Sequence, residues 1–168
     1  VDILHDGFDC VIRTGALPED GVIARPLGKL TMVNCASPHY LTRFGYPQSP
    51  DDLTSHAIVR YTPHLGVHPL GFEVASVNGV QWFKSGGMLT VNSSENYLTA
   101  GLAGLGIIQI PRIAVREALR AGRLIEVLPG YRAEPLSLSL VYPQRRELSR
   151  RVNLFMQWLA GVMKEYLD

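Results

Sequence analysis

The stretch Val91–Pro111 (VNSSENYLTAGLAGLGIIQIP) constrains the fold most, because it places a helix directly before a short apolar strand. Leu98, Leu102 and Leu105 recur at helical spacing and predict one apolar face on the helix. Small residues lie between these leucines, so the helix can approach a sheet closely. Ile107–Ile110 then reads as a buried strand. The stretch therefore predicts a helix packed against a sheet.

The start of this helix is polar. Asn92 can cap it, Glu95 three residues later can complete a capping box, and Gly106 is expected to end it. Asn92, Ser93 and Ser94 offer side-chain hydrogen-bonding groups beside free backbone N–H groups at the positive end of the helix dipole. Such a start can bind a carboxylate or a phosphate. A polar run that only caps a helix is the commoner arrangement, and both readings stay open.

The rest of the chain alternates predicted strands and helices, which indicates the α/β class. Strands are expected at residues 8–13, 30–36, 57–61, 72–77, 80–84, 124–128 and 136–142, and helices up to residue 7, from 38, from 111 to 121, and after 149. Asn78-Gly79 between two strand patterns predicts a type I′ hairpin turn. Leu136–Tyr142 is apolar except for its serines, which favours a central position in a sheet.

The last predicted helix is amphipathic. Ser149 can cap it, and apolar residues then recur at steps of three and four. These residues are Leu148, Val152, Phe155, Leu159, Val162 and Tyr166. Such a stripe is expected to be buried against a sheet or a partner.

Composition limits the function classes. The 168 residues carry a formal net charge of +1, which argues against a polyanion-binding chain. Four arginines around residues 145–151 could contact DNA, but a solvated or ion-paired helix start is the favoured reading. Cys10 and Cys35 lack metal-ligand spacing and read as reduced thiols of a cytosolic protein. No apolar run reaches the roughly 18 residues of a membrane span. The chain does not begin with methionine, and we expect it to begin within a longer sequence.

Two further candidates for ligand contact follow a predicted strand. Arg13 and Thr14 lie at its carboxyl end, where open α/β sheets bind ligands; a structural ion pair is an equal alternative for Arg13. His64 and His68 are four residues apart, but flanking prolines argue against a helix, so no metal site is predicted. Nucleophile, phosphate-loop and metalloprotease motifs are absent from the sequence, which predicts a ligand-binding domain without a catalytic residue or a cofactor.

Four sequence blocks resemble the C-terminal effector-binding domain of LysR-type transcriptional regulators. Residues 4–15 (LHDGFDCVIRTG) are similar to that family's L-x-x-G-x-D-x-x-I-R-x-G pattern. The other blocks are Ser37–Gly45 with the prolines and His56 that follow, Gly104–Pro111 (similar to G-x-G-I-x-x-x-P), and Val141–Arg146 with Val152, Phe155 and Trp158-Leu159. Together they span nearly the whole chain in the family's order.

The resemblance implies a type 2 periplasmic-binding-protein fold, in which two Rossmann-like lobes enclose an effector cleft. Lobe one would comprise residues 1–24 and 133–168, and lobe two residues 25–132. The family's domain starts several elements earlier, so lobe one is expected to be truncated at its N-terminal side and to expose apolar surface. The expected effector-binding residues are Arg13, Thr14, Asn92, Ser93, Ser94 and Pro111.

The function implied is that of a cytoplasmic sensor domain. A small-molecule effector, such as a carboxylate, would bind between the lobes and shift the geometry of a homodimer or homotetramer. DNA would be bound only through a separate N-terminal helix-turn-helix. The alternative is a solute-binding protein of the periplasmic type, which has the same architecture and would need a secretory signal upstream. No membrane association and no enzymatic activity are expected.

Overall fold

The computed structural model describes residues 7–15, 21–62, 71–144 and 148–167. The chain forms two compact units, Val1–Thr31 with Pro135–Asp168, and Met32–Glu134. Each unit is described separately below. The limits of the two lobes given above, at 24/25 and 132/133, stay a prediction. The helix predicted before Gly7 and the histidine pair at 64 and 68 lie outside the described residues.

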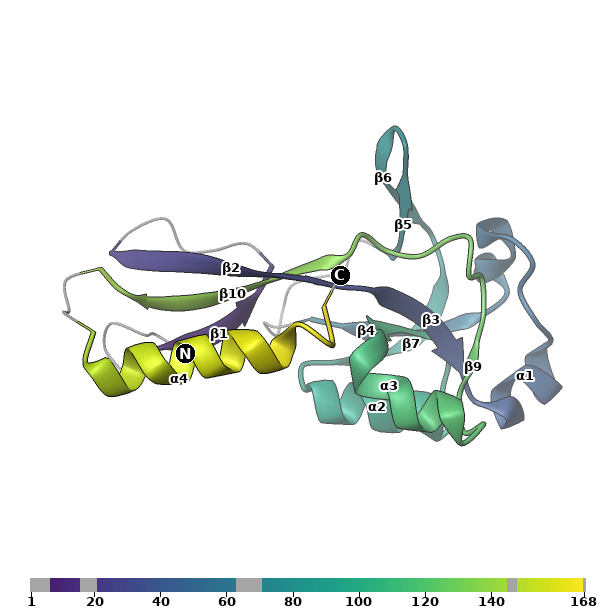
Figure 1. Cartoon of the computed structure of the whole chain (residues 1–168). Helices are drawn as coiled ribbons and strands as arrows, with labels where there is room; N and C mark the ends of the chain where they lie inside the picture. Colours follow the sequence, from purple (N-terminus) through teal and green to yellow (C-terminus); the bar gives the residue numbers. More distant parts are fainter. Residues whose placement is uncertain (1–6, 16–20, 63–70, 145–147, 168) are drawn as a thin grey trace. The chain divides into compact units, whose positions relative to one another are not determined.

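The first unit contains a three-stranded antiparallel sheet in the order β1-β10-β2 (Figure 1). Its strands are β1 (Val11–Thr14), β2 (Val22–Leu30) and β10 (Leu136–Pro143). The predicted central position of β10 is confirmed. The strand β2 was not predicted, because Pro26 and Gly28 interrupt the strand pattern of this segment. A register shift in β10 between Leu138 and Ser139, opposite Gly28 and Pro26, accommodates that proline.

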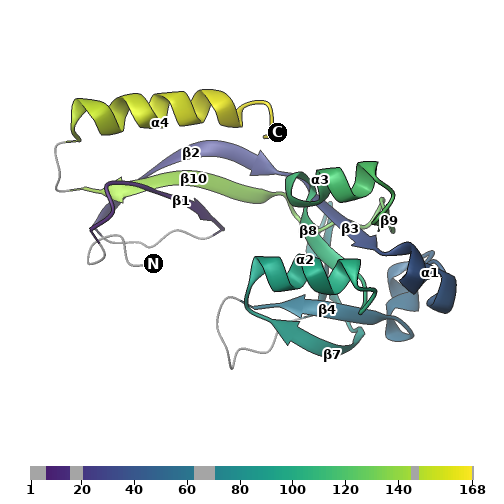
Figure 2. The same ribbon diagram turned by 90° about the horizontal axis from the view of Figure 1, so that it is seen from below.

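Helix α4 (Arg150–Met163) runs along this sheet (Figures 1 and 2). The predicted cap is confirmed, since the Ser149 side chain accepts a hydrogen bond from the Val152 N–H at 3.3 Å. Within this single chain Met156 is the buried residue of α4, and burial of the predicted apolar stripe against a sheet or a partner stays a prediction. Large apolar side chains remain exposed along the helix, namely Leu154, Phe155, Trp158 and Val162. The expected exposed apolar surface is therefore present on this unit.

The second unit is built on strands that contribute side chains to two apolar clusters. Strands β8 (Ile108–Pro111) and β9 (Ile125–Glu126) flank β3 (Met32–Ala36) in an antiparallel sheet. Strands β4 (Ala57–Tyr61) and β7 (Gly86–Val91) form a parallel pair. A parallel bridge between Ile58 and Ile107 links the two sets. β4 has the bounds predicted from the sequence.

Helices cover one face of these strands. Helices α2 (Ser94–Leu102) and α3 (Arg112–Arg120) lie near β8 and bury a cluster that includes Val33, Ile108 and Val115 (Figure 2). The small residues of α2 allow a close approach, because a Cβ atom added at Gly101 would lie 2.6 Å from Ile108 Cδ1. The predicted close packing of this helix is thus confirmed.

The other face is covered by a second cluster. Helix α1 (Pro38–Phe44), the 3₁₀ turn η1 (Pro50–Thr54), and strands β5 (Phe72–Ser76) and β6 (Gly79–Phe83) contribute to it. The cap predicted for α1 is confirmed, since the Ser37 hydroxyl accepts from the Tyr40 N–H at 3.2 Å. The predicted type I′ turn at Asn78-Gly79 is wrong. Ser76 pairs with Gly79, so Val77 and Asn78 form the turn, and Gly79 takes φ +104°.

Candidate functional site

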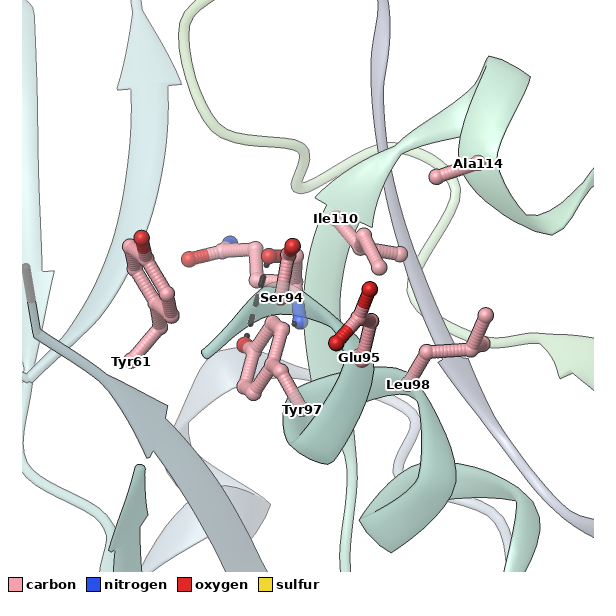
Figure 3. Close-up of a pocket in the computed structure, with 8 residues that line it drawn as sticks. Tyr61, Ser94, Glu95, Tyr97, Leu98, Ile110 and Ala114 are labelled. Carbon is pink, nitrogen blue, oxygen red and sulfur yellow. Dashed lines mark hydrogen bonds between the residues drawn. The ribbon is translucent and has the colours of Figure 1, made fainter. Parts of the chain in front are cut away.

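A pocket of about 260 Å³ opens in the second unit where β4 ends, α2 begins and β8 meets α3 (Figure 3). It is lined by Tyr61, Ser94, Glu95, Tyr97, Leu98, Gln109, Ile110 and Ala114. The walls are mostly aliphatic and aromatic. Ligand pockets combine such walls with a few polar groups that orient the ligand, and they begin at about 300 Å³ for drug-sized molecules. The volume therefore suits a small ligand.

The helix start beside the pocket is capped one residue later than predicted. Ser93, rather than Asn92, is the N-cap, and its hydroxyl accepts a hydrogen bond from the Asn96 N–H at 3.4 Å. The helix also ends earlier than Gly106, with Ala103 as C-cap and Gly104 at φ +77°. Ser93 is half-buried. The cap shift leaves Ser94 as the serine that lines the pocket.

Tyr97 forms the rigid wall of the pocket. Its side chain is buried, and its hydroxyl accepts from the Gln109 N–H at 2.8 Å and donates to the Gln109 carbonyl oxygen at 3.2 Å. Burial is the largest effect on the Tyr97 pKa and raises it above the usual range, since charge is disfavoured away from water. Tyr97 is therefore a neutral, fully engaged group.

Tyr61 forms the accessible wall. Its ring centroid lies 5.7 Å from that of Tyr97 at an interplanar angle of 52°, a tilted aromatic pair. Unlike Tyr97, Tyr61 is 44% exposed. It closes β4, and Thr62 after it is hydrogen-bonded through its N–H to the Val91 carbonyl at 2.9 Å. A ligand can thus contact one fixed ring and one solvent-facing ring.

The Gln109 side chain is held by other parts of the unit. Its amide Nε2 donates to the Glu73 carbonyl at 2.6 Å and to Asn34 Oδ1 at 3.0 Å, while its Oε1 accepts from the Glu73 N–H at 3.2 Å. Asn34 is fully buried, and its Nδ2 donates to the carbonyl oxygens of Leu128 and Tyr131. This network fixes the floor of the pocket and uses the hydrogen-bonding atoms of the Gln109 amide group.

Glu95 is the charged residue of the lining. It is exposed, and among the described residues it forms no ion pair. Figure 3 shows the Glu95 side chain on the same side of the Tyr97 ring as Ile110 and Leu98. An acidic side chain in the first turn interacts favourably with the helix dipole. Glu95 therefore has a structural role as well as a place in the pocket.

The predicted site residues fall in both units. Ser94 lines the pocket, Ser93 caps α2 beside it, and Asn92 is exposed just before the cap. Pro111 is half-buried and caps α3 directly after the lining residue Ile110. Arg13 and Thr14 belong to β1 of the first unit. Their place in an effector site together with the α2 start stays a prediction.

Sequence reasoning missed Tyr61, Tyr97 and Gln109. Tyr97 reads as one more apolar residue of a helix, and Tyr61 as the end of a strand. A signal existed for Gln109, since it is the one polar residue in the predicted strand Ile107–Ile110. A polar side chain in a buried strand needs partners, and it often marks a site.

The described parts of the chain contain no metal-binding cluster. No group of three or more His, Cys, Asp or Glu side chains there could hold a metal ion. Nor is any helix among the described residues long and apolar enough to cross a membrane.

Comparison with known proteins decides the family. The model of the LysR substrate binding domain matches residues 1–164. The chain belongs to this family. This LysR domain is 34% identical over 152 residues to an uncharacterized HTH-type transcriptional regulator of Haemophilus influenzae, covering 90% of the chain and 52% of the relative. It is 31% identical over 166 residues to the HTH-type transcriptional activator AaeR of Escherichia coli, covering 98% and 52%.

Solved structures show the same fold. The LysR domain superposes on the regulatory domain of CrgA from Neisseria meningitidis with a TM-score of 0.82 at 24% identity, covering 96% of this chain and 78% of that one. The effector domain of AmpR from Pseudomonas aeruginosa gives a TM-score of 0.75 at 22% identity, covering 98% and 78%. The predicted type 2 periplasmic-binding-protein-like α/β fold and LysR family are confirmed. The chain spans about half the length of the curated relatives it matches.

Proposed function

We propose that this effector-binding domain senses a small molecule through the pocket at the start of α2, and that it does so as part of a DNA-binding transcriptional regulator. The pocket is the observation that carries the proposal. It combines apolar walls, a buried tyrosine held on both sides by Gln109, and polar groups at its mouth. The relatives, which include an activator and a repressor, support the regulatory role.

The effector would act through the arrangement of the lobes. In this proposal one effector site comprises Arg13, Thr14, Asn92, Ser93, Ser94 and Pro111. The lobes are residues 1–24 with 133–168, and residues 25–132. A ligand shifts an equilibrium only by the difference between its affinities for the two states. Occupancy would bias a homodimer or homotetramer, and a separate N-terminal domain would bind DNA. The net charge of +1 makes this chain a poor DNA ligand by itself.

The proposal places the regulator in the cytoplasm and assigns it no catalytic step. A carboxylate remains the effector class predicted from the helix start. A solute-binding protein has the same architecture, but the relatives with 31–34% identity are transcriptional regulators. We therefore do not propose the transport alternative.

The test uses a full-length LysR-type regulator that carries this domain. Small organic compounds are first screened for a rise in the melting temperature, because a ligand that binds only the folded state stabilises it. Each hit is then added to the regulator bound to fluorescent operator DNA. The expected result is an altered affinity or altered footprint on the DNA. Hits that stabilise the domain without any change in DNA binding would refute a sensing role.

A further inference from the structure

The pocket offers a ligand few polar groups, because most of its hydrogen-bonding atoms are already used. The Tyr97 hydroxyl both donates to and accepts from the Gln109 backbone, and the Gln109 amide is bonded to Glu73 and Asn34. The polar groups left at the pocket are the Ser94 hydroxyl, the Tyr61 hydroxyl and the Glu95 carboxylate. Among the lining residues of the second unit, Glu95 is therefore the one that can select for charge.

The charge balance of the pocket lining in the second unit is negative. Glu95 is an acidic residue with no ion pair among the described residues. The helix start beside it contributes about half a positive charge, which offsets Glu95 only in part. Among the described residues, no lysine, arginine or histidine lines this pocket, and Arg13 of the proposed effector site belongs to the first unit. The field at this end of α2 thus opposes an anion and favours a cation or a hydrogen-bond donor.

The walls set the shape of the ligand. Two tyrosine rings with centroids 5.7 Å apart border an open pocket of about 260 Å³, which Leu98, Ile110 and Ala114 also line. The faces of aromatic rings carry partial negative charge and attract ammonium groups. A single aromatic ring with a short polar arm fits within such a space.

We infer that this pocket recognises a compact aromatic amine, whose ring packs between Tyr61, Leu98 and Ile110 and whose ammonium group faces Glu95. The inference rests on the proposed function and gives its site a ligand class. It differs from the carboxylate expected from the helix start, because Ser93 is engaged in capping and the neighbouring acid dominates the charge. The role of Glu95 is thus to select the ligand in addition to stabilising the first turn of α2.

Three probes of similar size test the inference: benzylamine, benzyl alcohol and benzoate. Isothermal titration of the 168-residue chain at low ionic strength is expected to show benzylamine binding roughly 10-fold or more tightly than benzoate, a difference of about 1.4 kcal/mol, with benzyl alcohol between them. Glu95→Gln should bring the affinity ratio of benzylamine to benzoate close to one and leave benzyl alcohol nearly unchanged. Added salt should weaken only the benzylamine preference.

Two control variants separate the possible outcomes. Glu117→Gln also replaces an acid with an amide, at an exposed position of α3 that pairs with Arg120 and does not line the pocket. This variant should keep the preference for benzylamine. Tyr61→Ala truncates an exposed pocket wall and should weaken all three probes. Benzoate binding at least as tightly as benzylamine, or a preference that survives Glu95→Gln, would overturn the ligand class and leave the sensing role standing. No probe binding, or no effect of Tyr61→Ala, would overturn the pocket itself.

Discussion

The hydroxyl of Tyr97 bridges both backbone groups of Gln109, accepting from its N–H at 2.8 Å and donating to its carbonyl oxygen at 3.2 Å. A helix side chain thereby completes the hydrogen bonding of a strand residue twelve positions later. The bridge ties α2 to β8 at the floor of the pocket. Since Gln109 also bonds Asn34 and Glu73, the pocket floor is continuous with the core of its unit.

Replacing Tyr97 with Phe should destabilise the domain by about 1–3 kcal/mol, because the partly buried N–H and carbonyl of Gln109 lose their partner. Chemical denaturation monitored by circular dichroism measures this loss. Tyr61→Phe is the matched control: Tyr61 is 44% exposed, and the change should cost well under 1 kcal/mol. Equal losses in the two variants would contradict the structural role of the bridge.

Ser93→Ala should lower both stability and ligand affinity. Removal of an N-cap costs about 1 kcal/mol, and the start of α2 that borders the pocket would fray. Ser149→Ala removes the corresponding cap of α4 in the other unit and should cost similar stability without weakening any ligand. Calorimetric titration with a hit from the effector screen measures ligand affinity in both variants, and only Ser93→Ala should show a loss.

Thr14→Ala tests the predicted participation of the first unit in the effector site. Thr14 is exposed at the end of β1, so the change should leave the melting temperature nearly unchanged. Ligand affinity should fall several-fold if the predicted site is correct. Unchanged affinity in both Thr14→Ala and Ser93→Ala would remove these residues from the site.

Gly101→Ala should destabilise the second unit by about 1–3 kcal/mol, because the added methyl group meets Ile108 Cδ1 at 2.6 Å in a packed core. In an uncrowded helix the same change is stabilising by about 0.4–1 kcal/mol. Gly161 in α4 has open space around its Cβ position, so Gly161→Ala provides that comparison. Opposite signs for the two variants in thermal unfolding are expected; a stabilising Gly101→Ala would show that α2 is not in close contact with β8.

Stability should fall as the pH drops below about 6.5, the ordinary pKa of histidine. His56 is buried, and its Nδ1 lies 3.0 Å from the Tyr40 hydroxyl. Burial lowers the pKa of His56 by disfavouring the imidazolium, and Asp52 nearby opposes this only in part. The unfolded state therefore binds a proton at higher pH than the folded state, so stability is full above 6.5 and declines toward the lower folded pKa.

Urea denaturation between pH 5 and 7 measures this slope. His56→Gln should be less stable at neutral pH and should lose most of the pH dependence. His39→Gln changes an exposed histidine and should retain the slope. A slope equal in wild type and His56→Gln would assign the pH dependence to other groups.

The two cysteines should react at very different rates. Cys35 is fully buried in β3, and burial raises its pKa to about 12, so its thiolate is both rare and inaccessible. Cys10 is only half-buried, although burial and Asp9 also raise its pKa. A thiol reagent should label Cys10 first in the native protein, and Cys10→Ser should leave only slow labelling that depends on unfolding. Rapid labelling of that variant would contradict the buried position of Cys35.

The local signals of the sequence determined the α/β class, the family and several element limits. The caps at Ser37 and Ser149 and the strand Ala57–Tyr61 agree with the structure, because caps and apolar runs depend on neighbouring residues. The central position of β10 followed from its nearly continuous apolar character. These features need no knowledge of distant contacts.

Tertiary structure alone decided the pocket and the details around it. The choice of Ser93 over Asn92 as cap, and of Val77 and Asn78 as the hairpin turn, depends on where the packed helix begins and on strand register. Tyr61, Tyr97 and Gln109 come from three separate elements, and only the packing of α2 on β4 and β8 brings them together. Sequence periodicity indicates which face of an element is apolar, whereas the partner of that face is set by contacts between residues far apart in the chain.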